Sequence, residues 1–121
     1  VFGSTENYRI PELAFLLPSH AAQLGPTGTN GADVLLEVRS PDDETYEKFA
    51  FYASVGVAEI IVVDSETRRP EVFRRTAGTY ATAPADRDGW LTVESLHIRL
   101  RLSAGTLIVG DTEDLSAQAS I

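Results

Sequence analysis

Residues 33–64 read DVLLEVRSPDDETYEKFAFYASVGVAEIIVVD, in which two apolar stretches flank a segment with helical periodicity. A strand over residues 33–39 has a side-chain period of two, so it places Glu37 and Arg39 on the same face. Residues 59–64 contain four consecutive branched apolar side chains, which is typical of a strand buried on both faces in a parallel pairing. The stretch therefore predicts a βαβ crossover with its helix lying across the sheet.

The segment between the two strands carries start and stop signals of a helix. Ser40 is a suitable N-cap, Pro41 stands at the first helical position, and acidic residues follow in the first turn. We expect the helix to run from Pro41 to about Val55 and to end at Gly56, a good left-handed C-cap residue. Apolar residues cover most of its circumference, so we expect it to be packed on more than one side.

Further strands are expected on both sides of this unit. The pattern predicts a strand at 9–17, a loop at 24–31, and strands at 71–75, 79–82, 89–93, 96–102 and 106–109. A Ser-Ala-Gly turn joins the last two strands, and the acidic, polar residues 110–121 are expected to form a flexible tail. The predicted fold class is α/β: a mixed sheet with a βαβ crossover and a C-terminal β-hairpin extension.

Composition narrows the function classes. A length of 121 residues predicts one domain, and the absence of cysteine excludes disulfides and thiolate metal sites. No apolar run approaches the roughly 18 residues of a membrane span, so no membrane association and a cytoplasmic location are expected. Eighteen acidic against ten basic residues give a net charge of −8, which disfavours diffuse binding to nucleic acid. The chain has a single lysine, Lys48.

A pair of carboxylates is the strongest candidate for chemistry. Glu12 and Glu37 lie on strands that antiparallel pairing would bring to within about 5 Å between Cβ atoms. Two converging carboxylates suit Mg²⁺, with Mn²⁺ as a substitute, and leave coordination sites for water and phosphate oxygens. Arg39 on the same strand face and Lys48 on the helix would flank the metal with positive charge, which suits phosphodiester hydrolysis.

Each of these residues also has an ordinary structural explanation. Taken alone, Glu12 and Glu37 are more typical of solvent-facing strand glutamates than of metal ligands. Arg39 reads as a partner in a surface ion pair, and Lys48 as a side chain whose stem covers aromatic neighbours. The two histidines, His20 and His97, are too few for a three-histidine zinc site. His97 lies in a predicted alternating strand, which favours a surface or packing residue.

A group of arginines is the best candidate for contacts to a nucleic-acid backbone in this acidic chain. The group is Arg68, Arg69, Arg74 and Arg75, on a turn and the strand that follows it. The alternative is a solvated hairpin tip.

Residues 31–75, GADVLLEVRSPDDETYEKFAFYASVGVAEIIVVDSETRRPEVFRR, resemble a segment of the bacterial Uma-two family of restriction-endonuclease-like proteins. That segment reads PDLVVEVLSP, then a helix with K-L-x-x-Y and G-V, then EYWIVD and VEVYR. Residues 9–15, RIPELAF, resemble the family's R-x-PD-V-A-F strand, and residues 91–115 resemble its closing segment and terminal hairpin. The resemblance covers nearly the whole chain.

This resemblance implies the PD-(D/E)XK nuclease fold, in which an acid after the proline and an acid on the next strand bind Mg²⁺. Glu12 takes the place of the first acid, where the family usually has aspartate, and Glu37 takes the place of the second. Lys48 matches the family's helical lysine, which would orient the water or stabilise charge. Arg39 stands where other members of the fold carry a strand lysine, and it would assist phosphate binding. The implied activity is Mg²⁺-dependent endonuclease cleavage of DNA.

We expect a single restriction-endonuclease-like domain over residues 1–121 that lacks the family's upstream helix and hairpin. The alternative function is a non-catalytic interaction module that keeps the fold and self-associates, as a homodimer, through its hairpin extension. The charge of −8 and the lack of the upstream segment favour this alternative.

Overall fold

The computed structural model describes residues 33–40 and 45–120. It also describes five short strands upstream: β1 (Phe2–Ser4), β2 (Asn7–Tyr8), β3 (Leu13–Phe15), β4 (Leu24–Gly25) and β5 (Gly28–Thr29). β3 lies inside the strand predicted at 9–17. β4 and β5 pair with each other inside the stretch 24–31, where the sequence predicts a loop.

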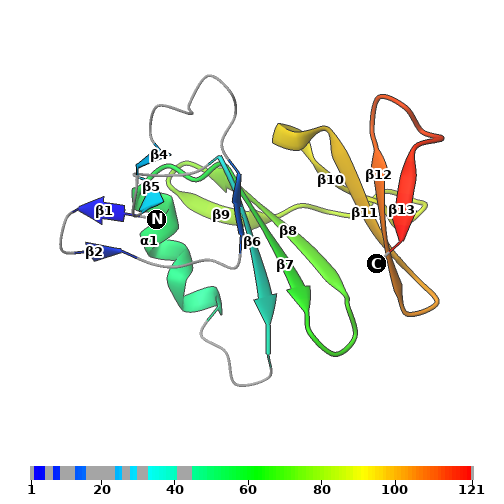
Figure 1. Ribbon diagram of the computed structural model, residues 1–121, viewed down its shortest axis with the longest axis horizontal. Coiled ribbons are helices and arrows are strands. Elements are labelled where there is room, and N and C mark those ends of the chain that lie inside the picture. The colour runs from blue at the N-terminus through cyan, green and yellow to red at the C-terminus, as the bar shows by residue number, and fades with distance from the viewer. Residues whose placement is uncertain are drawn as a thin grey trace.

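A five-stranded mixed sheet forms the centre of the molecule (Figure 1). Besides β3 it contains β6 (Val34–Arg39), β7 (Glu59–Asp64), β8 (Pro70–Thr76) and β9 (Thr79–Thr82), in the order β3-β6-β7-β8-β9. β6 and β7 pair in parallel, and the other neighbours are antiparallel. The predictions of strands at 33–39 and 59–64 are therefore confirmed, including their parallel pairing.

The connection between β6 and β7 is helical, but less regular than predicted. A 3-10 helix, η2 (Thr45–Lys48), leads into a six-residue α-helix, α1 (Phe49–Ser54). The prediction of an α-helix from Pro41 is wrong for residues 45–48, and its first turn lies outside the described residues. Threonine and tyrosine, which begin η2, have low helix propensity, and 3-10 turns are frequent at helix starts. Gly56 follows α1 with φ +79°, as the C-cap prediction requires.

A second, four-stranded antiparallel sheet follows in the chain, coloured yellow to red in Figure 1. It contains β10 (Leu91–Val93), β11 (Ile98–Ser103), β12 (Thr106–Asp111) and β13 (Gln118–Ser120), with a 3-10 helix, η3 (Glu94–Leu96), between β10 and β11. β11 and β12 form the predicted hairpin. Their turn residues, Ala104 and Gly105, both have positive φ, as a tight hairpin turn demands.

The expectation of a flexible tail over residues 110–121 is corrected by β13, which pairs with β12. The carboxylate of Asp111 accepts backbone hydrogen bonds from Glu113 and Asp114 and so shapes the turn between the two strands. An edge strand needs only backbone partners, so low apolar content did not prevent its pairing. Its side chains are all exposed, in keeping with their composition.

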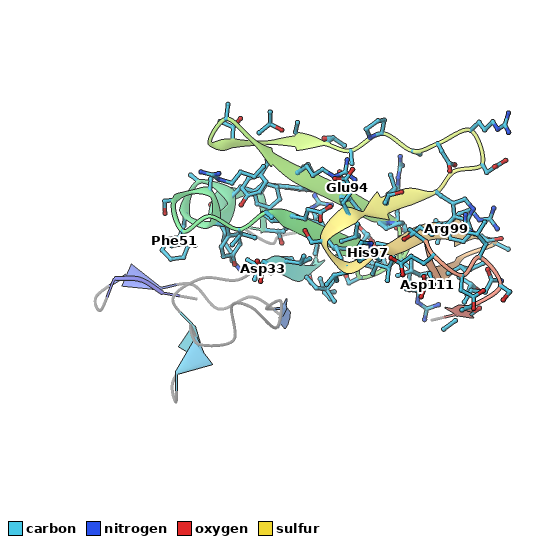
Figure 2. The ribbon with its side chains drawn as sticks, turned by 90° about the horizontal axis from the view of Figure 1, so that it is seen from above. Asp33, Phe51, Glu94, His97, Arg99 and Asp111 are labelled. Carbon is cyan, nitrogen blue, oxygen red and sulfur yellow. The ribbon has the colours of Figure 1, made fainter. Side chains whose placement is uncertain are left out.

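The helix, the five-stranded sheet and the four-stranded sheet form three layers, and an apolar cluster lies between each pair of neighbouring layers. The helix–sheet cluster joins α1 to one face of the five-stranded sheet, and its buried members are Leu35, Tyr52, Val57, Ile60 and Val62. The inter-sheet cluster joins the opposite face to the four-stranded sheet through Val34, Ile61, Val72, Val93, Leu100 and Leu107. In Figure 2, Phe51 of α1 and Arg99 of β11 accordingly lie at opposite ends of the view. No helix among the described residues has the length and hydropathy needed to cross a membrane.

Candidate functional site

Glu37 is a buried carboxylate in the middle of the sheet face that α1 covers. Only 2% of the residue is exposed. The hydroxyl of Tyr52 donates a hydrogen bond of 2.6 Å to its Oε1, and the Nζ of Lys48 lies 3.6 Å from its Oε2. Each carboxylate oxygen therefore faces a donor or cation from the helical connection, which compensates the cost of burying the charge.

The crossover itself creates this arrangement. Alternation along β6 turns Glu37 to the same side as Leu35, beneath the helix. Lys48 and Tyr52 are four residues apart at the junction of η2 and α1, so they project from the same side of the helical segment. The Lys48 side chain remains 27% exposed, which leaves the site open to solvent on that side.

Arg39 lies two residues further along the same face and is already engaged. Its Nη1 is 3.6 Å from Oδ2 of Asp64, and its guanidinium carbon is 5.3 Å from the centre of the Tyr46 ring. The Tyr46 hydroxyl in turn donates to Glu71 on β8. Burial, reinforced by the neighbouring Glu71 carboxylate, raises the pKa of Tyr46. The polar row thus continues from β6 across β7 to β8.

Asp64 anchors the turn that follows β7. Its Oδ1 accepts the backbone N–H groups of Glu66 and Thr67, each at 2.9 Å. The hydrogen bonds from Thr67 and Glu66 hold the pKa of Asp64 below its ordinary value, and Arg39 adds a smaller contribution in the same direction. Asp64 is therefore an ionised turn residue that also holds Arg39.

A groove of about 720 Å³ opens beside this polar row. Its wall comes from the carboxyl ends of β6 and β7, the β7–β8 turn and the segment that leads to β10; it includes Arg39, Val62, Asp64, Thr67, Arg69, Glu71, Pro84 and Leu91. Val62, the register partner of Glu37 on the neighbouring strand, lines the groove, whereas Glu37 and Lys48 are not among the residues of its wall. Open α/β sheets commonly bind ligands outside the carboxyl ends of their parallel strands, and β6 and β7 end here.

The four arginines predicted as one basic group do not form one. Arg68 and Arg69 lie in the β7–β8 turn, and Arg69 lines the groove, whereas Arg74 and Arg75 lie near the other end of β8. Five residues of strand separate Arg69 from Arg74 by about 17 Å. The Arg75 side chain donates to the carbonyl of Ala53. Proximity in sequence was misleading because an extended strand carries its neighbours apart.

Arg74 has a structural role. Its Nε lies 3.2 Å from Oε2 of the buried Glu59, and its Nη2 donates to the carbonyl of Thr92 at 2.6 Å. Glu59 also accepts the backbone N–H groups of Glu94 and Ser95 at the start of η3. These contacts join the two sheets. Arg74 is thus engaged in contacts between the two sheets.

Sequence reasoning missed both Tyr52 and Glu59. The spacing of four residues from Lys48 could have identified Tyr52, but its aromatic ring read as ordinary core. Nothing in the sequence marks Glu59 as buried, because its partners come from η3, which is 35 residues away in the chain. His97 is exposed and lies 3.5 Å from Glu113, in agreement with the surface alternative.

The predicted second metal ligand, Glu12, lies outside the described residues. Within the described part of the chain, no group of three or more histidine, aspartate or glutamate side chains could hold a metal ion. Among the described residues, Glu37 therefore offers one carboxylate group to a metal ion at this place, and Lys48 lies beside it.

Comparison with models of protein families identifies a family that this chain resembles. The model of Uma2, described as "Putative restriction endonuclease", matches residues 2–105. The search of curated proteins finds no match. The matched range includes the crossover, the groove and most of the second sheet, and the mixed α/β architecture is consistent with a restriction-endonuclease-like fold. The chain therefore belongs to the Uma2 family.

Proposed function

We propose that the chain is an endonuclease that hydrolyses phosphodiester bonds of DNA with Mg²⁺, or Mn²⁺, as its cofactor. The observation that carries the proposal is the buried Glu37 carboxylate with Lys48 beside it, in a member of this family. An acid and a cation held together suit phosphoryl chemistry, in which negative charge increases during the reaction.

Glu37 and Glu12 are the proposed metal ligands. Support for Glu12 comes from its described neighbours: Leu13 lies opposite Leu36 and Ala14 opposite Leu35 in the antiparallel β3–β6 pair. Glu12 comes directly before β3 in the sequence, and β3 pairs with the strand that carries Glu37. Mg²⁺ commonly takes one or two carboxylates and completes its shell with water and substrate oxygens, so this donor set fits it.

The bound ion would supply Lewis acidity at a phosphate oxygen and a more acidic water. The chain's own residues have separate tasks. Lys48 places a positive charge beside the Glu37 carboxylate, where it stabilises negative charge on the phosphate. Arg39 and Arg69 line the groove and are proposed to bind phosphates of the DNA backbone, for which a guanidinium is well suited.

Calorimetric titration with Mn²⁺ and Mg²⁺ tests the metal site without a substrate. Saturable binding is expected for the unaltered chain and is expected to disappear in Glu37→Ala and Glu12→Ala. Glu94→Ala is the control, because Glu94 is exposed and lies on the second sheet's side of the molecule. Equal, weak heats in all four proteins would contradict the proposed site. Cleavage of plasmid DNA by the unaltered chain, and not by Glu37→Ala, would then test the reaction.

The second candidate is a non-catalytic module that self-associates through its second sheet. Among the described residues β13 ends the strand order of that sheet, and its side chains are uncharged and exposed. Such an edge can pair with a strand of a second copy. Sedimentation velocity over a range of concentrations tests it: a dimer is expected, and a monomer throughout would exclude the homodimer.

A further inference from the structure

We infer that Tyr52 is a positioning residue of the proposed metal site: its hydroxyl holds Oε1 of Glu37, so that Oε2 is the oxygen presented to the cation. The inference rests on the proposed function, because it assigns a role at the same site. It adds a residue from the helix that was not among the predicted site residues.

Burial and packing hold the Tyr52 hydroxyl in a defined position. The residue has no exposed surface and belongs to the helix–sheet cluster, together with Leu35, Val57 and Ile60. The Phe51 ring also meets it edge to face, with centroids 5.9 Å apart. A close-packed interior resists displacement of such a ring. Because the ring cannot move easily, its 2.6 Å hydrogen bond restricts the movement of the Glu37 carboxylate.

The two carboxylate oxygens have different surroundings. Oε1 is bound by the buried hydroxyl, whereas Oε2 lies on the side of Lys48, whose side chain is partly exposed. Because the carboxylate is held at one oxygen, rotation about its terminal torsion is restricted and the direction of Oε2 is set. Ligating carboxylates commonly depend on hydrogen bonds of this kind.

A neutral donor suits this task better than a cation. The phenol orients the carboxylate but adds no positive charge that would repel a divalent ion. Lys48, in contrast, competes with a metal for Oε2 and suits interaction with a phosphate. Tyr52 and Lys48 are one helical turn apart and have different roles. Tyr52 orients the carboxylate of Glu37, and Lys48 supplies positive charge.

The alternative is that Tyr52 only satisfies a buried acid. A purely structural hydrogen bond would affect the stability of the protein and leave its metal affinity unchanged. The two roles are separated by comparing Tyr52→Phe with Tyr80→Phe. The Tyr80 hydroxyl donates to the carbonyl of Val57 at 2.7 Å in the same layer and does not contact Glu37. Burial raises the pKa of Tyr80 to about 12, so it remains a donor at neutral pH.

Mn²⁺ alone is the probe, titrated by calorimetry into the unaltered chain and both variants, with urea denaturation as the measure of stability. The dissociation constant is expected to rise about 10-fold or more in Tyr52→Phe, the scale of such supporting hydrogen bonds. In Tyr80→Phe it is expected to stay at the unaltered value. Unchanged Mn²⁺ affinity in Tyr52→Phe, or an equal loss in both variants, would overturn the inference and leave the proposed function standing.

A second measurement does not depend on the folding of Tyr52→Phe. Mn²⁺ binding beside Glu37 is expected to perturb the tyrosine absorbance band, both in the unaltered chain and in Tyr80→Phe. Saturable binding without this perturbation would overturn the inference alone. If the unaltered chain binds no Mn²⁺, the metal site of the proposed function falls, and the role of Tyr52 falls with it.

Discussion

At the scale of single residues, the burial of Glu37 requires its partners. A carboxylate that is 2% exposed costs free energy unless donors and opposite charge surround it. Tyr52 of α1 and Lys48 of η2 meet this need, and both belong to the connection between β6 and β7. Under the proposed function, the same contacts that stabilise the buried acid would also orient it towards a metal and a phosphate.

Replacement of the lysine ammonium tests this dependence. Lys48→Met keeps most of the stem and removes the charge, so Glu37 retains the Tyr52 hydrogen bond but loses its counter-ion. The free energy of unfolding is expected to fall by about 2 kcal/mol, measured by urea denaturation. Adding Glu37→Gln to this variant is expected to restore much of the loss, because no buried charge then lacks a partner. Equal stability of Lys48→Met and the unaltered chain would show that the ion pair contributes nothing.

At the scale of elements, Glu59 connects three of them. It begins β7, pairs with Arg74 of β8 and accepts two backbone N–H groups at the start of η3. A carboxylate at the start of a helical turn satisfies N–H groups that have no partner within the turn. The contact between the two sheets thus contains a buried polar junction next to its apolar cluster.

The junction is tested by removal of the carboxylate. Glu59→Ala leaves Arg74 and two backbone donors without this acceptor, and the free energy of unfolding is expected to fall by about 3 kcal/mol. Glu94→Ala is the matched control, because Glu94 also pairs with Arg74, at 3.7 Å, but is 68% exposed. Its loss is expected to cost less than about 1 kcal/mol in the same urea experiment. Comparable losses in both variants would rule out the special role of the buried acid.

The β7–β8 turn predicts a dependence on pH. Backbone hydrogen bonds lower the pKa of Asp64 in the folded protein, so its charge stabilises the turn above the ordinary carboxyl pKa of about 4. That contribution is lost as the pH falls through the lowered value. Asp64→Asn is therefore expected to unfold at lower urea concentration at pH 7, and the difference is expected to shrink towards pH 3. A difference that is constant with pH would contradict this assignment.

At the scale of the whole molecule, charge and shape constrain how DNA could bind. With a net charge of −8 the chain repels a polyanion at long range, so local contacts have to overcome that repulsion. The groove at the carboxyl ends of β6 and β7 carries Arg39 and Arg69, whereas Arg74 is engaged at the junction between the sheets. Backbone contacts are therefore expected at the groove and not along the whole of β8.

The salt dependence of DNA binding distinguishes these surfaces. Arg69→Ala is expected to reduce the slope of log affinity against log salt by about one, as for the loss of one phosphate contact. Arg68→Ala is the control, since Arg68 lies in the same turn and is not one of the residues of the groove wall. Fluorescence anisotropy with duplex DNA, without divalent ions, measures both. Equal slopes for the two variants would argue against the groove as the binding surface.

The strands could be predicted because their patterns are local. Alternation over residues 33–39 and the apolar run at 59–64 specify buried strands, and the sheet has both with parallel pairing. The tail was mispredicted because β13 depends on backbone pairing with β12, which side-chain composition does not reveal. Residues 45–48 form a 3-10 helix and not the predicted α-helix, because threonine and tyrosine at its start have low helix propensity.

In the candidate site, too, some features could be predicted from the sequence and others could not. Glu37, Arg39 and Lys48 could be named from residue type and spacing, since a strand of period two and the helix after it limit where their side chains point. The sequence by itself determined the crossover, the acid on its first strand and the lysine on its helix. Only the tertiary structure decided that Tyr52 binds that acid, that Arg74 belongs to Glu59, and that the four arginines separate. These contacts join residues 15 or more positions apart, and no local pattern encodes which of the available partners a folded chain brings together.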